Sequence, residues 1–115
     1  MKILITGIAG GIGSTLGHHL FKFGHEIVGV DSFENGHEEN LTIKGESFCK
    51  FYELRIQDFL ILDLLSCEKP DVVIHLAATS SLPECEQDSC KCYLNNTILT
   101  QTLLESSKKN NVKFI

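Results

Sequence analysis

A glycine-rich turn near the start of the sequence has the residue types and spacing to hold a phosphate group. It runs from Thr6 to Gly13 and places glycines at positions 7, 10, 11 and 13. Glycines allow a tight turn, let backbone N–H groups approach a pyrophosphate closely, and let a following helix pack hard against the preceding strand. The helix N-terminus adds the positive end of its dipole. The turn therefore predicts a dinucleotide pyrophosphate site built from backbone atoms.

An acidic residue at a suitable distance supports this interpretation. Asp31 lies eighteen residues past Gly13, at the end of the next apolar run, where a carboxylate can accept hydrogen bonds from an adenosine ribose. No Lys or Arg occurs between Asp31 and Lys44, so no neighbouring cation would neutralise a 2′-phosphate, and the carboxylate would repel one. The pattern favours NAD over NADP, and it disfavours the alternative of a plain turn beside a solvated strand end.

The elements that must position these residues alternate between apolar strands and longer helical patterns. Strands are expected over residues 2–6, 26–30, 48–54 and 72–76, and one more apolar run begins at 112. Helices are expected over 13–23, 58–65 and 89–109, with loops over 32–46 and 77–83. Such alternation implies a parallel sheet with helices on both faces. The expected fold is α/β, a Rossmann-type doubly wound parallel sheet truncated at about the fifth strand, because the sequence ends inside an apolar run.

The helical segments repeat their apolar residues on one side. In the first helix, which Gly24 should end, the expected buried face consists of Ile12, Leu16, Leu20 and Phe23. In the long helix it consists of Leu94, Ile98, Leu99, Thr102 and Leu103. The short middle helix should begin at a cap, Asp58, and carry Asp63 and Glu68 on a solvated face.

Length, composition and charge exclude several classes of protein. The chain has 115 residues, enough for one domain, with 43% hydrophobic and 22% charged residues. Its formal net charge is −5 and its basic residues do not cluster beyond Lys108 and Lys109, which argues against nucleic acid as a partner. Its apolar runs are shorter than the roughly 20 residues of a membrane span. We therefore expect neither a nucleic-acid-binding nor a membrane protein.

The cysteines indicate a reducing compartment. Five cysteines at irregular spacing are an odd number, so reduced thiols and a cytoplasmic location are the simplest expectation. Cys85, Cys90 and Cys92 lack the paired spacing of a structural zinc site, and no metal site is expected. His75, at the end of an apolar strand, is expected to be a hydrogen-bonded core residue.

Several segments together resemble one family. The Gly7-x-x-Gly10-x-x-Gly13 pattern resembles the fingerprint of the extended short-chain dehydrogenase/reductases, although Gly7-x-x-x-Gly11-x-Gly13 fits the single-domain branch equally. The tetrapeptide His75-Leu76-Ala77-Ala78 matches the extended branch. The loop over 31–41 looks like that of nucleotide-sugar 4-epimerases, and residues 95–105 resemble a helix motif of the same family. Across its whole length the chain is similar to the NAD-dependent epimerase/dehydratase family.

The chain departs from the family pattern at two places. The family usually carries an Asp-Ile or Asp-Leu pair after the third strand, close to the adenine, where this chain has Arg55-Ile56 or, in a shifted register, Glu53-Leu54. Leu99 replaces the glycine that lets the long helix lie close to its neighbour, so local repacking is expected there.

The resemblance assigns roles to individual residues. It implies that the pyrophosphate turn consists of Gly7, Gly10, Gly11, Ile12 and Gly13, and that Asp31 accepts hydrogen bonds from the ribose. Further implied cofactor contacts are Ser32, Asn35, Gly36, Ile56, Leu76, Ala77, Ala78 and either Asn95 or Asn96. Ser80 and Ser81 would border the substrate, a nucleotide sugar, unless they are plain turn formers. The resemblance also allows a homodimer through the long helix.

The family's catalytic pair is missing from this sequence. Members of the family use a tyrosine whose pKa is lowered by a lysine four residues later. Here Tyr52 and Tyr93 are followed at that spacing by Ile56 and Thr97. No catalytic residue is therefore assigned, and residues 1–115 are expected to be the N-terminal part of an NAD-binding domain whose catalytic segment and substrate domain lie elsewhere. The full-length protein would be an isomerase or lyase, and this chain alone would not turn over. The alternative is a catalytically inert dinucleotide-binding sensor or partner module.

Overall fold

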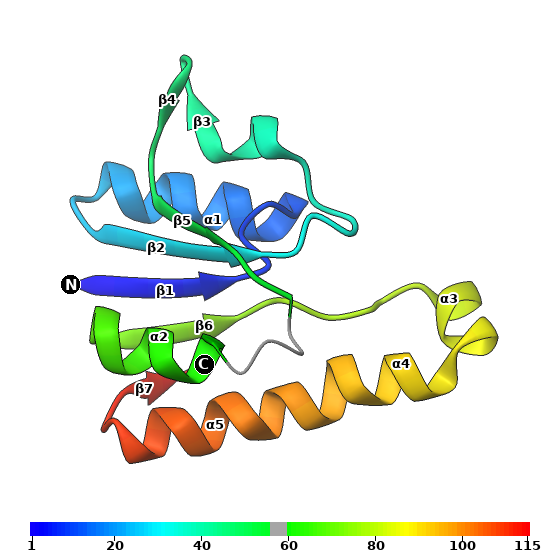
Figure 1. Ribbon diagram of the computed structural model, residues 1–115. Coiled ribbons are helices and arrows are strands. Elements are labelled where there is room, and N and C mark those ends of the chain that lie inside the picture. Colours follow the sequence, from blue (N-terminus) through cyan, green and yellow to red (C-terminus); the bar gives the residue numbers. More distant parts are fainter. Residues whose placement is uncertain (56–59) are drawn as a thin grey trace.

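One parallel sheet organises the protein in the computed structural model, which describes residues 1–55 and 60–115 (Figure 1). Its strands are β1 (Lys2–Thr6), β2 (Glu26–Asp31), β5 (Lys50–Glu53), β6 (Val72–His75) and β7 (Lys113–Phe114). Their order is β5-β2-β1-β6-β7, and each pair is parallel. The expected α/β fold with a doubly wound parallel sheet is confirmed. Because the chain leaves β1 toward one edge and later returns to β6 on its other side, a topological switch point lies between β1 and β6.

Helices cover both faces of the sheet. Helix α1 (Gly11–Lys22) lies on one face, and α2 (Leu60–Glu68) and α5 (Leu99–Lys109) lie on the other (Figure 1). Alternate strand residues divide between the two layers: Ile3 and Ile5 join the cluster on the α1 side, whereas Leu4 joins the cluster on the side of α2 and α5. The strands are therefore continuous apolar runs because both of their faces are buried.

The apolar face that the sequence suggested for α1 is buried only in part: Leu16 and Leu20 are half-buried, and Leu20 packs against the core. Ile12 and Phe23 are 76% and 80% exposed, so their expected burial is wrong. The helix instead buries Gly13, Ser14 and Gly17, and a Cβ on Gly17 would lie 2.7 Å from the Ile8 side chain. A helix that packs this closely uses its small residues at the contact, and its larger residues are displaced to the rim.

Two segments expected to be loops contain regular structure. The segment after β2 forms a 3₁₀ turn (Glu38–Leu41) and an antiparallel hairpin of β3 (Thr42–Ile43) and β4 (Glu46–Ser47). The segment after β6 forms α3 (Leu82–Gln87), whose N-terminus is capped by the Ser81 hydroxyl accepting from the Glu84 N–H. Asp58, the expected cap of α2, lies outside the described residues.

The long helix contains a π turn that changes which residues face the sheet. Helix α4 (Ser89–Tyr93) continues through a π turn (Leu94–Ile98) into α5. Leu94 and Ile98 are 41% and 38% exposed, contrary to expectation, whereas Leu99 and Leu103 are buried as expected. The π turn lies immediately before Leu99, where the sequence predicted local repacking, and Asn95 is its buried residue. Among the described helices, none combines the length and apolar character needed to cross a membrane.

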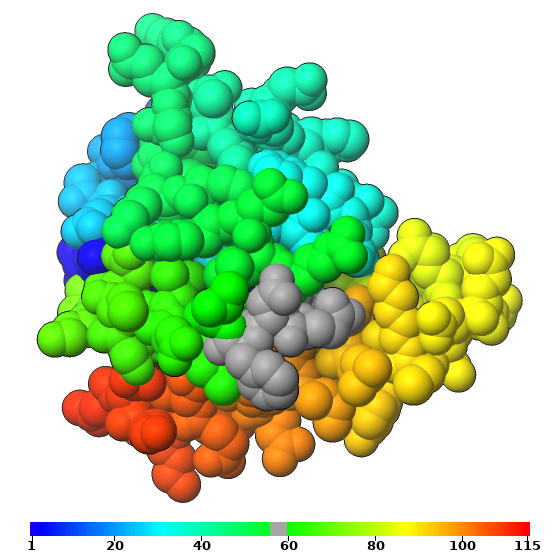
Figure 2. Space-filling model, in the orientation of Figure 1, coloured from blue at the N-terminus to red at the C-terminus, as the bar shows by residue number. Residues whose placement is uncertain are grey.

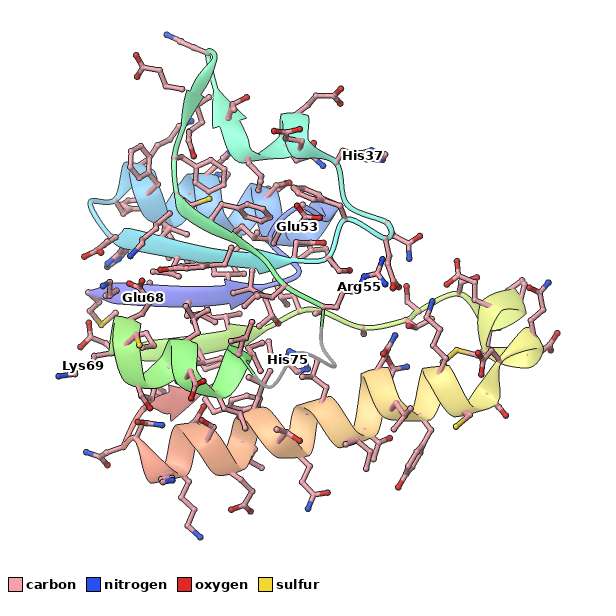
Figure 3. The ribbon with its side chains drawn as sticks, in the orientation of Figure 1. His37, Glu53, Arg55, Glu68, Lys69 and His75 are labelled. Carbon is pink, nitrogen blue, oxygen red and sulfur yellow. A yellow bond between two sulfur atoms is a disulfide. The ribbon has the colours of Figure 1, made fainter. Side chains whose placement is uncertain are left out.

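Glu68 is a buried ion-pair centre and not the solvated residue that was expected. Its side chain, 5% exposed, accepts hydrogen bonds from Lys2 Nζ at 2.9 Å, from Lys50 Nζ at 2.5 Å and from the Tyr52 hydroxyl. These contacts, the one from Lys50 first, lower the pKa of Glu68 to about 2. The carboxylate thus joins α2 to β1 and β5 near the end of the sheet away from His75 (Figure 3).

We expect Glu68→Gln to reduce the free energy of unfolding by about 2 kcal/mol, since it leaves two ammonium groups without their shared carboxylate. The contribution of Glu68 to the free energy of unfolding should be complete above the ordinary pKa of this group, 4.5. It should disappear as the pH falls from there toward 2, because the folded state holds this carboxyl ionised. Denaturant unfolding at several pH values measures both effects. Glu26→Gln is the matched control: Glu26 contacts the same Lys2 but is 63% exposed, so a loss as large as that of Glu68→Gln would contradict this account.

Candidate functional site

A cavity of about 390 Å³ opens at the C-terminal ends of β1, β2 and β6, beside the topological switch point. Of the residues that the sequence assigned to the cofactor or substrate, each one described in the structure lines it, while Ile56 lies outside the described residues. Asn95 lines the cavity and its alternative Asn96 does not. Leu54, named for the adenine side in the shifted register, also lines the cavity. The sequence did not assign the other lining residues, which are Thr6, Val30, Glu34, Ile61, Thr79, Glu84 and Leu99.

The glycine turn leaves backbone groups open to the cavity. Gly7 has a φ of +73°, and a Cβ there would lie 2.8 Å from the Ala77 nitrogen. A Cβ on Gly13 would lie 2.1 Å from the Gly7 carbonyl oxygen. Within the described chain, α1 begins at Gly11 without a side-chain cap or an acidic residue in its first turn. Its first N–H groups are therefore available to an anion, and the helix dipole favours one there.

Asp31 connects the end of β2 to the glycine turn. Its Oδ2 accepts from the Ala9 N–H at 2.9 Å and its Oδ1 accepts from the Phe33 N–H at 3.0 Å. Phe33 has a positive φ of 57°, and the residues on either side of it, Ser32 and Glu34, line the cavity. A carboxylate has about four acceptor positions, so each oxygen of Asp31 can still accept a hydrogen bond from a ligand hydroxyl.

The two neighbouring asparagines of the long helix do different things. Asn96 brackets the Thr79 backbone: its Nδ2 donates to the Thr79 carbonyl and its Oδ1 accepts from the Thr79 N–H, each at 2.8 Å. Asn95, 5% exposed, donates through Nδ2 to the Thr79 hydroxyl at 3.0 Å. Its Oδ1 has no partner among the described residues. A buried amide oxygen without a partner beside a cavity is available to a ligand donor.

His75 joins the strand to the long helix under the cavity (Figure 3). Its Nδ1 lies 2.6 Å from the Thr6 hydroxyl and its Nε2 lies 3.1 Å from the Thr100 hydroxyl. Because Thr100 donates to the Asn96 carbonyl and Thr6 accepts from the Ala77 N–H, the network is satisfied by a neutral ring with its proton on Nε2. His75 is thus the hydrogen-bonded residue expected from the sequence.

Burial lowers the pKa of His75 below its ordinary value of 6.5. We therefore expect its imidazole resonances to titrate below pH 6.5 in the folded protein. Folding favours the neutral ring, so the unfolded state takes up the proton first as the pH drops. The contribution of His75 to the free energy of unfolding is therefore complete above pH 6.5 and falls below it. An NMR titration measures this midpoint directly, and a value at or above 6.5 would contradict the burial of a neutral ring.

The cavity holds groups for binding and lacks the tyrosines of this chain. Tyr52 donates to Glu68 at the other end of the sheet, and Tyr93 is 56% exposed on α4. Neither lines the cavity. The described lining residues therefore provide backbone N–H groups for a phosphate, a carboxylate that can accept from hydroxyls, and the amide side chain of Asn95. They do not include the tyrosine base that the resemblance would require for catalysis.

Known proteins share both this sequence and this fold. The profile of the NAD dependent epimerase/dehydratase family matches residues 3–115. A UDP-glucose 4-epimerase of Lactobacillus helveticus is 37% identical over 116 residues, which cover 100% of this chain and 34% of that protein. The chain spans about a third of the length of the curated relatives it matches.

Solved structures agree with the sequence comparison. The structure of UDP-glucose 4-epimerase from Thermotoga maritima with UDP-glucose has a TM-score of 0.90 and 35% identity, covering 99% of this chain and 36% of that one. The Bordetella bronchiseptica enzyme WbmH in complex with NAD+ has a TM-score of 0.85 and 35% identity, covering 98% and 37%. With the family profile matched over nearly all of its length, this chain belongs to the NAD dependent epimerase/dehydratase family.

Proposed function

We propose that residues 1–115 are the NAD-binding part of a nucleotide-sugar epimerase or dehydratase. The observation that carries the proposal is the convergence on one cavity of the open glycine turn, the Asp31 carboxylate and the unpartnered Asn95 Oδ1. These groups fit a dinucleotide, which presents a pyrophosphate, ribose hydroxyls and a carboxamide. The bound nicotinamide would supply a transient hydride acceptor for a sugar carbon.

The residues of this chain would hold and orient the cofactor. The N–H groups at the start of α1 would bind the pyrophosphate, and Asp31 would accept from the adenosine ribose. Ser32, Asn35 and Gly36 would border the adenosine, Leu54 lies on the same wall, and residues 76–78 would form the wall of the cleft. Ser80 and Ser81 would face the nucleotide-sugar substrate.

Calorimetric titration tests the cofactor assignment. We expect one molecule of NAD to bind per chain, and NADP to bind at least tenfold more weakly because the Asp31 carboxylate, which lines the cavity, would repel a 2′-phosphate on the ribose that it binds. Equal affinity for the two dinucleotides would contradict the role of Asp31, and binding of neither would contradict the proposed function.

Turnover would belong to a longer polypeptide. We propose that the tyrosine and lysine of the family, the sugar-binding residues and any homodimer contact of the long helix act together with these residues in that protein. The curated relatives are about three times as long as this chain, which supports the proposal. The polypeptide that carries this sequence should interconvert a nucleotide sugar and its 4-epimer or dehydrate it, with UDP-glucose as the first substrate to try.

A catalytically inert dinucleotide-binding module is the second candidate. It is favoured by one observation, namely that neither tyrosine has a lysine four residues later or lies at the cavity. The mass of the native polypeptide, measured with an antibody against this sequence, separates the two. A product much heavier than 12.8 kDa supports the enzyme, and a product of 12.8 kDa supports the inert module.

A further inference from the structure

A disulfide joins two helices beside the segment that lines the cavity. Cys85 of α3 and Cys92 of α4 are bonded, with their Cα atoms 5.3 Å apart, and the sulfur–sulfur link between the two helices is visible in Figure 3. The expectation of reduced thiols is wrong for this pair, while Cys49, Cys67 and Cys90 are free. Both sulfurs of the pair lie close to one backbone atom, the Thr79 carbonyl oxygen, at 3.8 Å and 3.7 Å.

The same carbonyl belongs to the segment that lines the cavity. Thr79, Ser80 and Ser81, which connect β6 to α3, and Glu84 of α3 are lining residues. Thr79 is bracketed by Asn96 and hydrogen-bonded by Asn95, so both sulfurs and the two asparagines contact the same residue of this segment. A change at the sulfurs is therefore transmitted to the cavity wall through a single residue.

Helix α3 has little else to hold it. None of its six residues is buried, and α3 and the start of α4 project from the rest of the molecule (Figure 2). Its described anchors are the Ser81 cap at one end and the Cys85–Cys92 link. An ion pair between Lys91 and Glu34, at 3.3 Å, ties α4 to the loop on the far side of the cavity but does not involve α3.

One of the two sulfurs can be reached by a reagent. Cys92 is 9% exposed, whereas Cys85 is only half-buried. A thiolate or a small disulfide from solution would therefore react at Cys85, and Cys92 would act as the buried second thiol that closes the ring.

We propose that Cys85 and Cys92 are a reversible dithiol–disulfide site that sets the affinity of the cavity for NAD; the inference rests on the proposed function. In the oxidation, the two thiols react with one low-molecular-weight disulfide, such as glutathione disulfide. The Cys85 thiolate displaces one glutathione and forms a mixed disulfide; the Cys92 thiolate then displaces the second. One S–S bond forms in the protein, one is reduced in the reagent, and the two protons leave with the two released thiols.

The two states differ in how the cavity wall is held. In the bonded state α3 is tied to α4, and the Thr79 carbonyl accepts from Asn96. In the reduced state α3 loses its covalent link, and two S–H donors compete for the carbonyl that Asn96 already uses. Residues 79–85 then lose order that NAD binding must restore, so the reduced protein binds NAD more weakly.

The test compares both redox states of the full chain. After treatment with glutathione disulfide, alkylation of the unfolded protein should label three cysteines by mass, and after treatment with dithiothreitol it should label five. We expect the NAD dissociation constant to be at least threefold higher in the reduced state. Cys85→Ser should show the weaker affinity under both treatments, whereas Cys90→Ser, which changes an exposed cysteine outside the pair, should keep the redox response.

Amide hydrogen exchange gives a readout that does not need NAD. Residues 79–88 should exchange faster after reduction in the wild type and at the same rate under both treatments in Cys85→Ser. Five labelled cysteines after oxidation would overturn the inference. So would equal NAD affinities of the oxidised and reduced proteins when the disulfide has formed in the oxidised one. Both results would leave the proposed function intact. Absence of NAD binding in both states would overturn the proposed function and the coupling with it.

Discussion

Gly13→Ala is expected to weaken NAD binding by about a hundredfold, the equivalent of roughly 3 kcal/mol. The added Cβ would lie 2.1 Å from the Gly7 carbonyl oxygen and 2.9 Å from the Ile8 Cα, both of which are backbone atoms that cannot rotate away. The start of α1 must therefore move away from the turn, and its N–H groups lose their common direction toward the pyrophosphate. Isothermal titration with NAD measures the effect.

A second glycine two residues earlier provides the contrast. At Gly11 no atom lies within 4 Å of the added Cβ, so Gly11→Ala should keep the fold and reduce NAD affinity far less than Gly13→Ala. Circular dichroism of both variants shows whether the sheet and helices form. A folded Gly13→Ala protein that binds NAD within threefold of the wild type would contradict the assignment of the turn as the phosphate site.

Asp31→Asn is expected to weaken NAD binding by about ten- to a hundredfold, because hydrogen bonds to a charged acceptor contribute roughly 1.5–3 kcal/mol. The amide keeps nearly the same shape but replaces one acceptor oxygen with a donor. It cannot then accept from Ala9, Phe33 and the ribose together. The loss of the negative charge should also raise the affinity for NADP relative to NAD.

The ratio of the NADP affinity to the NAD affinity distinguishes a loss of ribose recognition by Asp31 from a general loosening of the loop after β2. A structural defect would weaken NAD and NADP equally, whereas removal of the carboxylate should narrow the difference between them. Asp63→Asn, the same change on an exposed residue of α2 outside the cavity, should leave both affinities unaltered. An unchanged ratio of NADP to NAD affinity in Asp31→Asn would contradict the role given to Asp31.

The strands were predictable because their burial on both faces appears in the sequence as consecutive apolar residues. Ile3, Leu4 and Ile5 alternate between two hydrophobic clusters, so a central strand buries all three. The gathering of the candidate site residues around one cavity was predictable for a related reason. The carboxyl ends of β1, β2 and β6 meet at one edge, so residues that follow these strands must gather there.

The helices were harder to predict because their packing depends on distances that periodicity does not contain. The close approach of Gly17 to Ile8 decides the buried face of α1, and it leaves Ile12 and Phe23 at the surface. The π turn before Leu99 likewise moves Leu94 and Ile98 outward. Neither the packing of Gly17 against Ile8 and Phe48 nor the change of helix type at 94–98 is visible in the spacing of apolar residues.

The ion pairs of Glu68 and the Cys85–Cys92 disulfide were missed because each joins residues of different elements. Glu68 reads as a surface residue of a short helix, yet lysines from two different strands meet it in the fold. Thr79 has no sequence signature, although it receives both asparagines and lies beside both sulfurs. A signal was available for the cysteines: Cys85 and Cys92 are seven residues apart, a spacing that allows two short helices to fold back on each other.

The most direct test of the central claim is a map of NAD binding at individual residues. Amide resonances of the isotope-labelled protein would be followed by NMR during a titration with NAD. The account predicts saturable shifts at Gly10, Gly11, Gly13, Asp31 and Asn95, which line one cavity, and small shifts around Glu68 at the other end of the sheet. Saturable shifts centred elsewhere, or none at the glycine turn at millimolar NAD, would contradict it.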